Sequence, residues 1–416
     1  MKVYIIKYRH LLKIGFKIIT LTYFLLSFFY FIIIAVEGRG DELLFINDLK
    51  YIHKFGWIDA IEKGVSVPYM LIVYPFSMFL REFIALRIIN LLLLLCLFLY
   101  FLKIIRIRSN DFYYYIFFFL GTSPVFFMGT NDALFYLGMI LFMTEVFYFI
   151  ENKKMNSEVL AFSGLVIFIF TRELYVVYLP IIFLSFYYLY KNGYEFISKS
   201  LIFPIILALF FFVLNIPSLK ANNSLSYDVK LPPKEYRVSW SQRQYLAQLL
   251  VNRGDVDNYN HPSWEQTQEY LNQNGPNSLP EGIFQGIIFD YNLTIKEFFK
   301  DLYYLIFFGF RQLSLILLFP FYYIVVYFMK HEYFNNNLYI PYCFTAMVII
   351  FSFIIISFVE LRWLFAVFML SIIFYNHIEE QVALSHKILQ LNYFIVLCFS
   401  LLGIFGLVKK VGLSFI

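Results

Sequence analysis

Four short groups of polar residues interrupt the apolar stretches of this 416-residue chain. They are Gly40-Asp41-Glu42, Thr130-Asn131-Asp132, Thr171-Arg172-Glu173 and Glu360-Leu361-Arg362-Trp363. An acidic pair is costly where it enters the apolar layer of a membrane, and an arginine at the membrane surface suits lipid phosphate oxygens. If the groups share one face of a membrane, they indicate a polar site at its surface.

Each group also has a structural explanation. Asp41 and Asp132 are good N-cap residues for the stretches that follow them. Arg172 and Glu173 fit an interfacial ion pair, which contributes ~0–1 kcal/mol. Arg362 can be explained as an arginine whose aliphatic part lies in the apolar layer while its guanidinium group reaches the membrane surface. Trp363 beside it fits the belt of tryptophans at that surface. The residue types leave both explanations open for every group.

The four tryptophans divide into two kinds. Trp57 and Trp363 stand near apolar stretches, where tryptophan is enriched in any membrane protein. Trp240 and Trp264 stand in a polar stretch, where that explanation does not apply. Flat aromatic faces beside carboxylates are typical of sugar-binding clefts, and packing in the core of the polar stretch is the alternative.

The elements that hold these residues are predicted to be membrane helices. Hydrophobic residues make up 61% of the chain and charged residues 15%, against ~25% charged residues in soluble domains. Apolar stretches of ~20 residues recur without alternation, which favours helices over a β-barrel. The fold class is therefore an all-α polytopic membrane bundle of about 11–13 transmembrane helices. The expected spans are 14–36, 66–80, 84–102, 112–129, 132–150, 158–171, 174–190, 199–216, 312–329, 338–358, 362–377 and 389–408.

One long polar stretch divides the chain into three regions. Residues 1–216 form a membrane domain with an acidic first outer loop, and residues 300–416 form further membrane helices. Residues 217–299 hold Pro232-Pro233 and many Asn and Gln residues, and they are expected to form an extracytoplasmic subdomain of mixed structure.

The distribution of Lys and Arg predicts the orientation, because cytoplasmic loops carry the excess of positive charge. Lysines and arginines cluster before the first span and at 103–108, 153–154, 191–199 and 330–331, which places the N-terminus in the cytoplasm. All four polar groups and all four tryptophans then lie outside. Two conflicts remain: segment 66–80 adds one crossing too many unless it is re-entrant, and Lys409-Lys410 falls outside.

Several kinds of site are excluded or unsupported. The three cysteines lie in apolar stretches without ligand spacing, so no metal site or disulfide is expected. No nucleotide-binding loop, zinc-protease motif or serine-hydrolase motif is present. The net charge of +5 sits at span ends, which is topology signalling rather than a nucleic-acid footprint.

The order of several stretches resembles a known family. GDELLFINDLKYIHKFGW is followed by SVPYMLIVYP, then by REFIALRIINLLLLL, SPVFFMGTNDALFYLGMILF and TRELYVVYLP. This succession over about residues 1–190 resembles the GT-C superfamily of polyprenyl-phosphate-sugar glycosyltransferases, which includes protein O-mannosyltransferases and lipid A aminoarabinose transferases. The chain lacks the paired prolines that many relatives carry near position 68.

The resemblance implies a mechanism and partners. Asp41 would be the general base for an acceptor hydroxyl, which contributes ~10²–10⁴-fold. Glu42 and Asp132 would orient the acceptor, Arg172 or Arg362 would stabilise the departing phosphate, and no cofactor is required beyond an optional divalent cation. The partners would be a polyprenyl-phosphate-linked sugar, the lipid bilayer and a glycan, lipid or protein acceptor, in the inner (plasma) membrane.

Two other classes stay open, and a non-enzymatic assembly factor is the remaining alternative. A polysaccharide polymerase or ligase of the O-antigen type also has about a dozen helices and one large outer loop, and the spacing of Arg243 and Gly254 mimics a pattern of that group. A flippase or transporter would place polar residues near the bilayer midplane, where this sequence has few.

Overall fold

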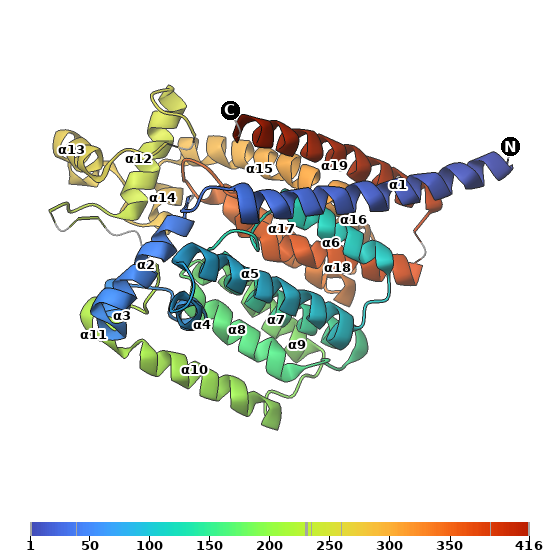
Figure 1. The fold of residues 1–416 in the computed structure, drawn as a ribbon, viewed down its shortest axis with the longest axis horizontal. Helices are drawn as coiled ribbons and strands as arrows, with labels where there is room; N and C mark the ends of the chain where they lie inside the picture. The colour runs from blue at the N-terminus through green and yellow to red at the C-terminus, as the bar shows by residue number, and fades with distance from the viewer. Residues whose placement is uncertain are drawn as a thin grey trace. The chain divides into compact units, whose positions relative to one another are not determined.

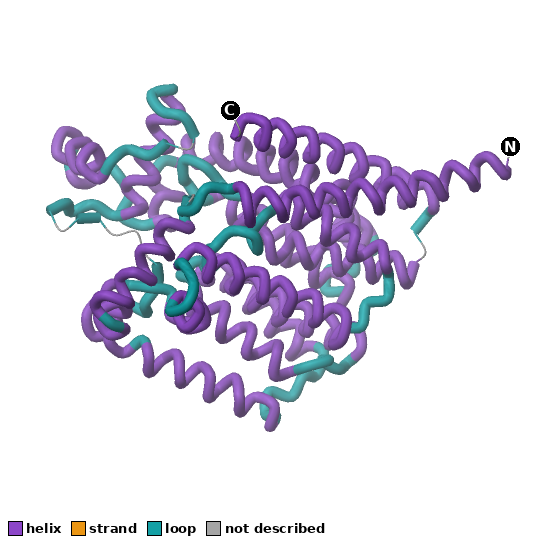
Figure 2. The backbone as a smooth tube through the Cα atoms, in the orientation of Figure 1, coloured by secondary structure: helices purple, strands orange, loops and turns teal. Residues whose placement is uncertain are grey.

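A computed structural model of the chain describes residues 2–38, 40–228, 232–233, 235–258, 260–382 and 384–414. Every regular element in these ranges is helical, and no strand occurs in them (Figure 2). The predicted all-α class is therefore confirmed.

The chain divides into two compact units. The first comprises Met1–Asp228, Phe310–Phe344 and Phe365–Ile416, and the second comprises Val229–Gly309 and Thr345–Leu364. The second unit differs from the expected subdomain 217–299, because it begins later and includes residues that follow α17. Its elements are helical in the described ranges rather than of mixed structure.

The first unit contains most of the helices. They are α1 (Lys2–Phe29), α2 (Glu42–Phe55), α3 (Trp57–Lys63), α4 (Val67–Ser77), α5 (Glu82–Leu99), α6 (Asn110–Thr122), α7 (Asp132–Asn152), α8 (Glu158–Thr171), α9 (Tyr175–Lys191), α10 (Ile202–Leu214), α11 (Ile216–Asn222), α16 (Leu318–Met329), α18 (Phe365–Val382) and α19 (His386–Ser414). α15 (Tyr291–Leu313) and α17 (Tyr339–Phe353) run through both units.

Seven described helices are long and apolar enough to cross a membrane, or eight if the bent pair α10 and α11 counts as one span. Helices α4, α8 and α9 are apolar but shorter. The multi-pass membrane character is therefore confirmed. Several of the expected 11–13 spans correspond to these shorter helices.

Helix α4 bears on the conflict in the predicted topology. It has 11 residues and contains Pro75, so at 1.5 Å per residue it is about 16 Å long. The hydrocarbon core is about 30 Å thick, so a helix of this length does not cross it. This favours the re-entrant alternative for segment 66–80, which leaves α5 as the single crossing between the acidic loop and residues 103–108.

The end of the polar stretch expected at 217–299 is also helical, because α15 begins at Tyr291. Residues Tyr291–Met329 form one long apolar element, whereas the expected span began only at residue 312. The element is broken at Ser314, whose backbone has a left-handed φ of 57°. The amide of Leu315 there donates to Asn392 Oδ1 at 3.2 Å, which satisfies a backbone group that the break releases.

Glycines set the closest helix contacts of the first unit. A Cβ on Gly164 of α8 would lie 2.6 Å from the Gly138 carbonyl oxygen of α7, so both helices need glycine at this crossing. Tyr23 of α1 lies between Gly121 of α6 and Gly403 of α19, where an added Cβ would collide with its ring. α1 accordingly runs alongside α19 (Figure 1).

The segments expected in the cytoplasm contact one another. Asp111, just inside α6, forms ion pairs with Lys13 at 2.6 Å and Lys17 at 3.1 Å. Lys153, after α7, donates to the side chain of Asn192, after α9. Lys13, Lys17 and Lys153 therefore each contact another segment that the charge pattern places on the same side of the membrane.

Two Ser-x-x-Gln capping boxes begin helices of the second unit. Ser239 caps α12 (Trp240–Arg253) and Ser263 caps α13 (Trp264–Asn274), each with a returning glutamine three residues later. A third short helix is α14 (Ile283–Phe289). The apolar core of the unit consists of Val238, Tyr245, Leu246, Leu271, Leu279 and Ile355.

Candidate functional site

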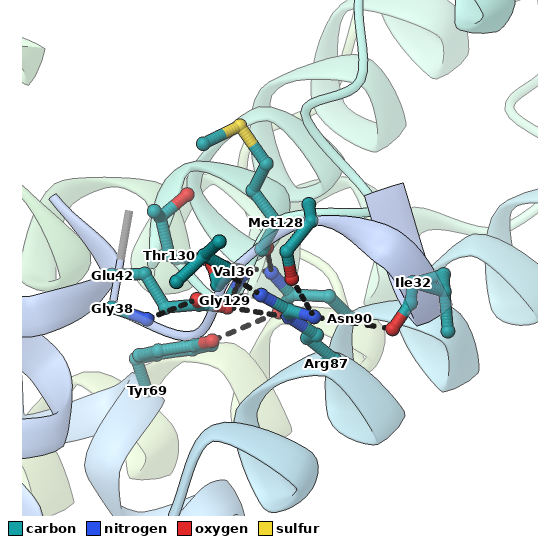
Figure 3. Close-up of polar contacts among 11 residues, drawn as sticks. Ile32, Val36, Gly38, Glu42, Tyr69, Arg87, Asn90, Met128, Gly129 and Thr130 are labelled. Carbon is teal, nitrogen blue, oxygen red and sulfur yellow. Dashed lines mark hydrogen bonds and ion pairs between the residues drawn. The ribbon is translucent and has the colours of Figure 1, made fainter. Parts of the chain in front are cut away.

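A buried ion pair lies at the start of α2. Glu42 is 2% exposed and Arg87 of α5 is 6% exposed. Arg87 Nε and Nη2 donate to Glu42 Oε1 and Oε2, both at 2.8 Å (Figure 3). The backbone amides of Gly38 and Gly129 donate to the same carboxylate at 2.9 and 3.1 Å. Four donors from three segments therefore hold Glu42 in one position.

Arg87 also fixes the end of the first membrane helix. Its remaining N–H groups donate to the carbonyls of Ile32, Ala35 and Val36 at 3.1 to 3.3 Å. A buried charge pair offsets its desolvation only when its other hydrogen-bonding groups are also satisfied, and this pair meets that condition. The pair thus joins α1, α2 and α5 in one rigid arrangement.

Asn90 extends the network by one turn of α5. Its Oδ1 accepts from Tyr69 Oη at 3.0 Å, and its Nδ2 donates to the carbonyl of Thr130 at 2.9 Å and to that of Met128 (Figure 3). The loop between α6 and α7 is therefore held against α4 and α5. Gly129 in this loop is required, because a Cβ would lie 2.8 Å from Glu42 Oε1 and 2.6 Å from Leu86 Cβ.

The same loop leads into a second buried ion pair. Asp132, the first residue of α7, is 1% exposed and pairs with Arg172, which follows α8. The carbonyl of Thr171 accepts from Asn131 Nδ2 at 3.3 Å and from Ser66 Oγ at 2.7 Å. Predicted site residues from three distant stretches, Glu42, Asp132 and Arg172, therefore belong to one connected network.

Asp41 stands at the edge of this network. It is half-buried, its carbonyl accepts from the amide of Leu44 at 3.1 Å, and its side chain makes no capping bond to α2. Asp132 likewise lies inside α7 rather than at its N-cap, which is Asn131. The helix-cap explanation therefore holds for neither aspartate.

Two other residues predicted for the site, Trp57 and Glu173, also belong to the first unit. Trp57 begins α3, and its ring packs edge-on against Tyr74 of α4 at a centroid distance of 5.2 Å. Glu173 is exposed after Arg172, and its carbonyl accepts from the amide of Val176 at 3.0 Å. Trp57 therefore has a packing role between α3 and α4.

The remaining predicted residues belong to the second unit. Arg362 forms an ion pair with Glu360, in which Nη2 and Oε1 are 3.0 Å apart. Trp240 begins α12, and Trp264 packs against the apolar core at the start of α13. The nine residues predicted from the sequence are thus divided between the two units.

Sequence reasoning missed the roles of Arg87 and Asn90. The signal was present, because they are two polar residues three apart in the apolar run REFIALRIINLLLLL. Polar residues inside a membrane segment are expensive and face partners in the bundle. The identity of those partners depends on contacts with Glu42 and Thr130, which are distant in the sequence.

The carboxylates of Glu42 and Asp132 do not fit a divalent cation. Glu42 already accepts four hydrogen bonds and Asp132 pairs with a guanidinium group. In the described ranges, no group of three or more His, Cys, Asp or Glu residues is placed to hold a metal ion. A cation at Glu42 or Asp132 would have to displace an arginine side chain.

The network therefore consists of two buried ion pairs next to the half-buried Asp41, and it contacts the end of the first membrane helix opposite Lys13 and Lys17. No protein-family model matches the sequence, and neither a curated protein nor a solved structure matches it.

Proposed function

We propose that the chain is a membrane glycosyltransferase, which moves a sugar from a polyprenyl-phosphate donor to a glycan, lipid or protein acceptor of the cell envelope. The observation that supports this most is the position of Asp41, which directly precedes the immobilised Glu42. A general base works best when its position is fixed before the substrate binds. The ion pair with Arg87 supplies that rigidity.

The proposed reaction is a displacement at the anomeric carbon of the sugar. Asp41 accepts the proton of the acceptor hydroxyl while the acceptor oxygen forms a bond to that carbon. The bond between the anomeric carbon and the phosphate oxygen breaks, and polyprenyl phosphate leaves with the bonding electrons. No nucleotide is needed, because the sugar–phosphate bond supplies the free energy.

Arg172 is the residue of the network best suited to the departing phosphate. Its side chain is 26% exposed, whereas that of Arg87 is 7% exposed. A guanidinium group close to a developing negative charge stabilises it strongly where water is excluded. Asp132 orients Arg172, and Glu42 orients the start of α2, so we assign both acids a positioning role.

The proposed location of the reaction is the outer face of the inner (plasma) membrane. The lysines paired with Asp111 lie at the opposite end of the first unit from the Glu42 network, which fits a cytoplasmic N-terminus. Lys410 near the end of α19 lies 6.0 Å from the ring centroid of Tyr30, the first residue after α1. The C-terminal lysines would then lie outside, which is the exception to the charge rule already noted for Lys409-Lys410.

The test is sugar transfer by the full chain in proteoliposomes. The probes are undecaprenyl phosphates that carry radiolabelled mannose, glucose or aminoarabinose, mixed with envelope extract as the acceptor. The wild-type chain should release polyprenyl phosphate from at least one probe, and Asp41→Asn should reduce that release by at least ~10²-fold. Glu37→Gln, which removes an exposed acid from the same loop, should leave it unchanged. Full activity of folded Asp41→Asn would disprove the assignment of the base.

A further inference from the structure

The second unit contains a half-buried arginine that the proposed reaction does not use. Arg243 lies in the first turns of α12, and its Nε donates to the carbonyl of Pro262 at 2.6 Å. The centre of its guanidinium group lies 4.8 Å from the ring centroid of Trp264. One hydrogen bond and one aromatic face therefore fix the plane of the guanidinium group.

Arg243 has no acidic partner among the described residues. No carboxylate there forms an ion pair with it, and burial alone lowers the pKa of its guanidinium group. Arginines that lose part of their hydration are normally paired with an acid. An arginine held in a fixed plane without such a partner is prepared for an anion from outside the chain.

Further polar groups lie beside Pro262. His261 precedes it and is exposed, and its Nδ1 is 3.1 Å from Ser357 Oγ. Ser357 belongs to the segment that follows α17. The chain therefore brings α12, the start of α13 and this segment together. The imidazole group of His261 is next in the sequence to Pro262, whose carbonyl holds Arg243.

An aromatic surface continues from α12. Trp240, Gln244 and Tyr245 line a shallow depression with Gly282 of the loop before α14 and with Ile355 and Ile356. Tyr245 and Gln244 are buried at its base, whereas Trp240 is half-buried, and a tryptophan face can carry the apolar face of a sugar ring. The depression and Arg243 lie on the same short helix.

We propose that this part of the second unit binds an acidic glycan, with Arg243 taking its anionic group and the surface at Trp240 taking a neighbouring sugar ring. The two Nη atoms of a guanidinium group match the two oxygens of a carboxylate or a phosphate in a bidentate arrangement. The proposal rests on the proposed function in one respect: the glycan would be the acceptor. Its binding can nevertheless be measured without any transfer.

The experiment is calorimetric titration of the full chain in lipid nanodiscs with three probes. Trigalacturonate carries carboxylates, glucose 1-phosphate carries a phosphate and maltotriose carries no charge. Trigalacturonate or glucose 1-phosphate should bind, and maltotriose should bind at least about ten-fold more weakly than the better anion. Whichever anion binds more tightly identifies the anionic group of the glycan.

Matched variants of one helix separate this site from general charge effects. Arg243→Gln should weaken binding of the better anion by about ten-fold or more, and Arg253→Gln at the exposed end of α12 should change it less than two-fold. Arg243→Lys keeps the charge but loses the planar fork, so it should bind weakly while it melts like the wild-type chain.

Three results would overturn the proposal: no binding of either anion, equal losses in the Arg243 and Arg253 variants, or equal affinity for maltotriose. The Asp41→Asn variant separates glycan binding from sugar transfer. Binding that survives in this variant, while transfer is lost, is expected if both proposals hold. Binding without transfer by the wild-type chain would contradict the proposed function and leave the glycan site intact.

Discussion

Arg87 and Glu42 form a bidentate ion pair, in which both N···O distances are 2.8 Å and neither residue is more than 6% exposed. The pair crosses from α5 to the start of α2, next to Asp41. Because the burial of a single charge is far more costly than the burial of a pair, this contact should stabilise the part of the first unit that contains Asp41.

Removing one partner of this pair should destabilise the fold strongly. Arg87→Met leaves the Glu42 carboxylate buried without a counter-charge, so the free energy of unfolding should fall by about 3–5 kcal/mol. Replacing both partners, as Arg87→Met with Glu42→Leu, should recover a large part of this loss. Denaturant unfolding in detergent measures both values, and a double variant that is less stable than Arg87→Met would contradict the explanation.

Gly129→Ala should disturb the same pair through steric contact. The new Cβ would lie 2.8 Å from Glu42 Oε1 and 2.6 Å from Leu86 Cβ, so the loop or the carboxylate must move. Overpacking of this kind costs about 1–3 kcal/mol, and transfer activity should fall because Asp41 moves with Glu42. Gly406→Ala in α19 meets no atom within 4 Å and serves as the control, which should not lose stability.

Asp48 should make stability depend on pH. It is 3% exposed in α2, burial raises its pKa from 3.8 to about 6, and Lys63 at 3.6 Å only partly offsets this. The unfolded chain releases this proton at lower pH than the folded chain does. The contribution of Asp48 to stability is therefore greatest below about pH 4, falls by about 2–3 kcal/mol up to about pH 6 and then stays lower.

Asp48→Asn should remove this dependence. The variant should melt at a higher temperature than the wild-type chain at pH 8, and the difference should vanish near pH 4. Asp59→Asn removes an exposed acid of α3 and should change neither value. If Asp48→Asn were less stable than the wild-type chain at pH 8, the pairing with Lys63 would outweigh the burial cost.

The short length of α4 predicts from which side of the membrane the end of this helix can be labelled. Phe79 follows α4 and stays on the outer side if this helix does not cross, so Phe79→Cys should react with a membrane-impermeant maleimide added to intact cells. Lys154→Cys, on the basic side of the bundle, should react only after the cells are lysed. Labelling of Phe79→Cys only after lysis would mean that segment 66–80 crosses the bilayer.

The length of the apolar runs predicted several helices closely. The expected span 158–171 matches α8 at both ends, because Glu158 begins the helix and the charged pair after Thr171 ends the apolar run. The start of α15 was missed, because its first turns contain Lys296, Glu297 and Lys300. These polar groups have partners, with Lys300 and Glu297 at 3.1 Å, which the order of the residues does not reveal.

The candidate site was predictable only in part. The acidic pair and Arg172 are visible as polar outliers in the sequence, and the charge pattern places them on one face. The pairing of Glu42 with Arg87 is not visible, because 45 residues separate them. Hydrophobic periodicity reports which face of a helix is buried, but a specific ion pair depends on the packing of whole helices against one another.

Tyr23 has a consequence for the order in which the protein is assembled. Its ring lies between Gly121 of α6 and Gly403 of α19, and these two helices are far apart in the chain. Synthesis proceeds from the N-terminus, so α1 and α6 enter the membrane long before the ribosome has made α19. One side of the Tyr23 ring should therefore face lipid until translation is almost complete, and the docking of the last helix is expected to close the bundle.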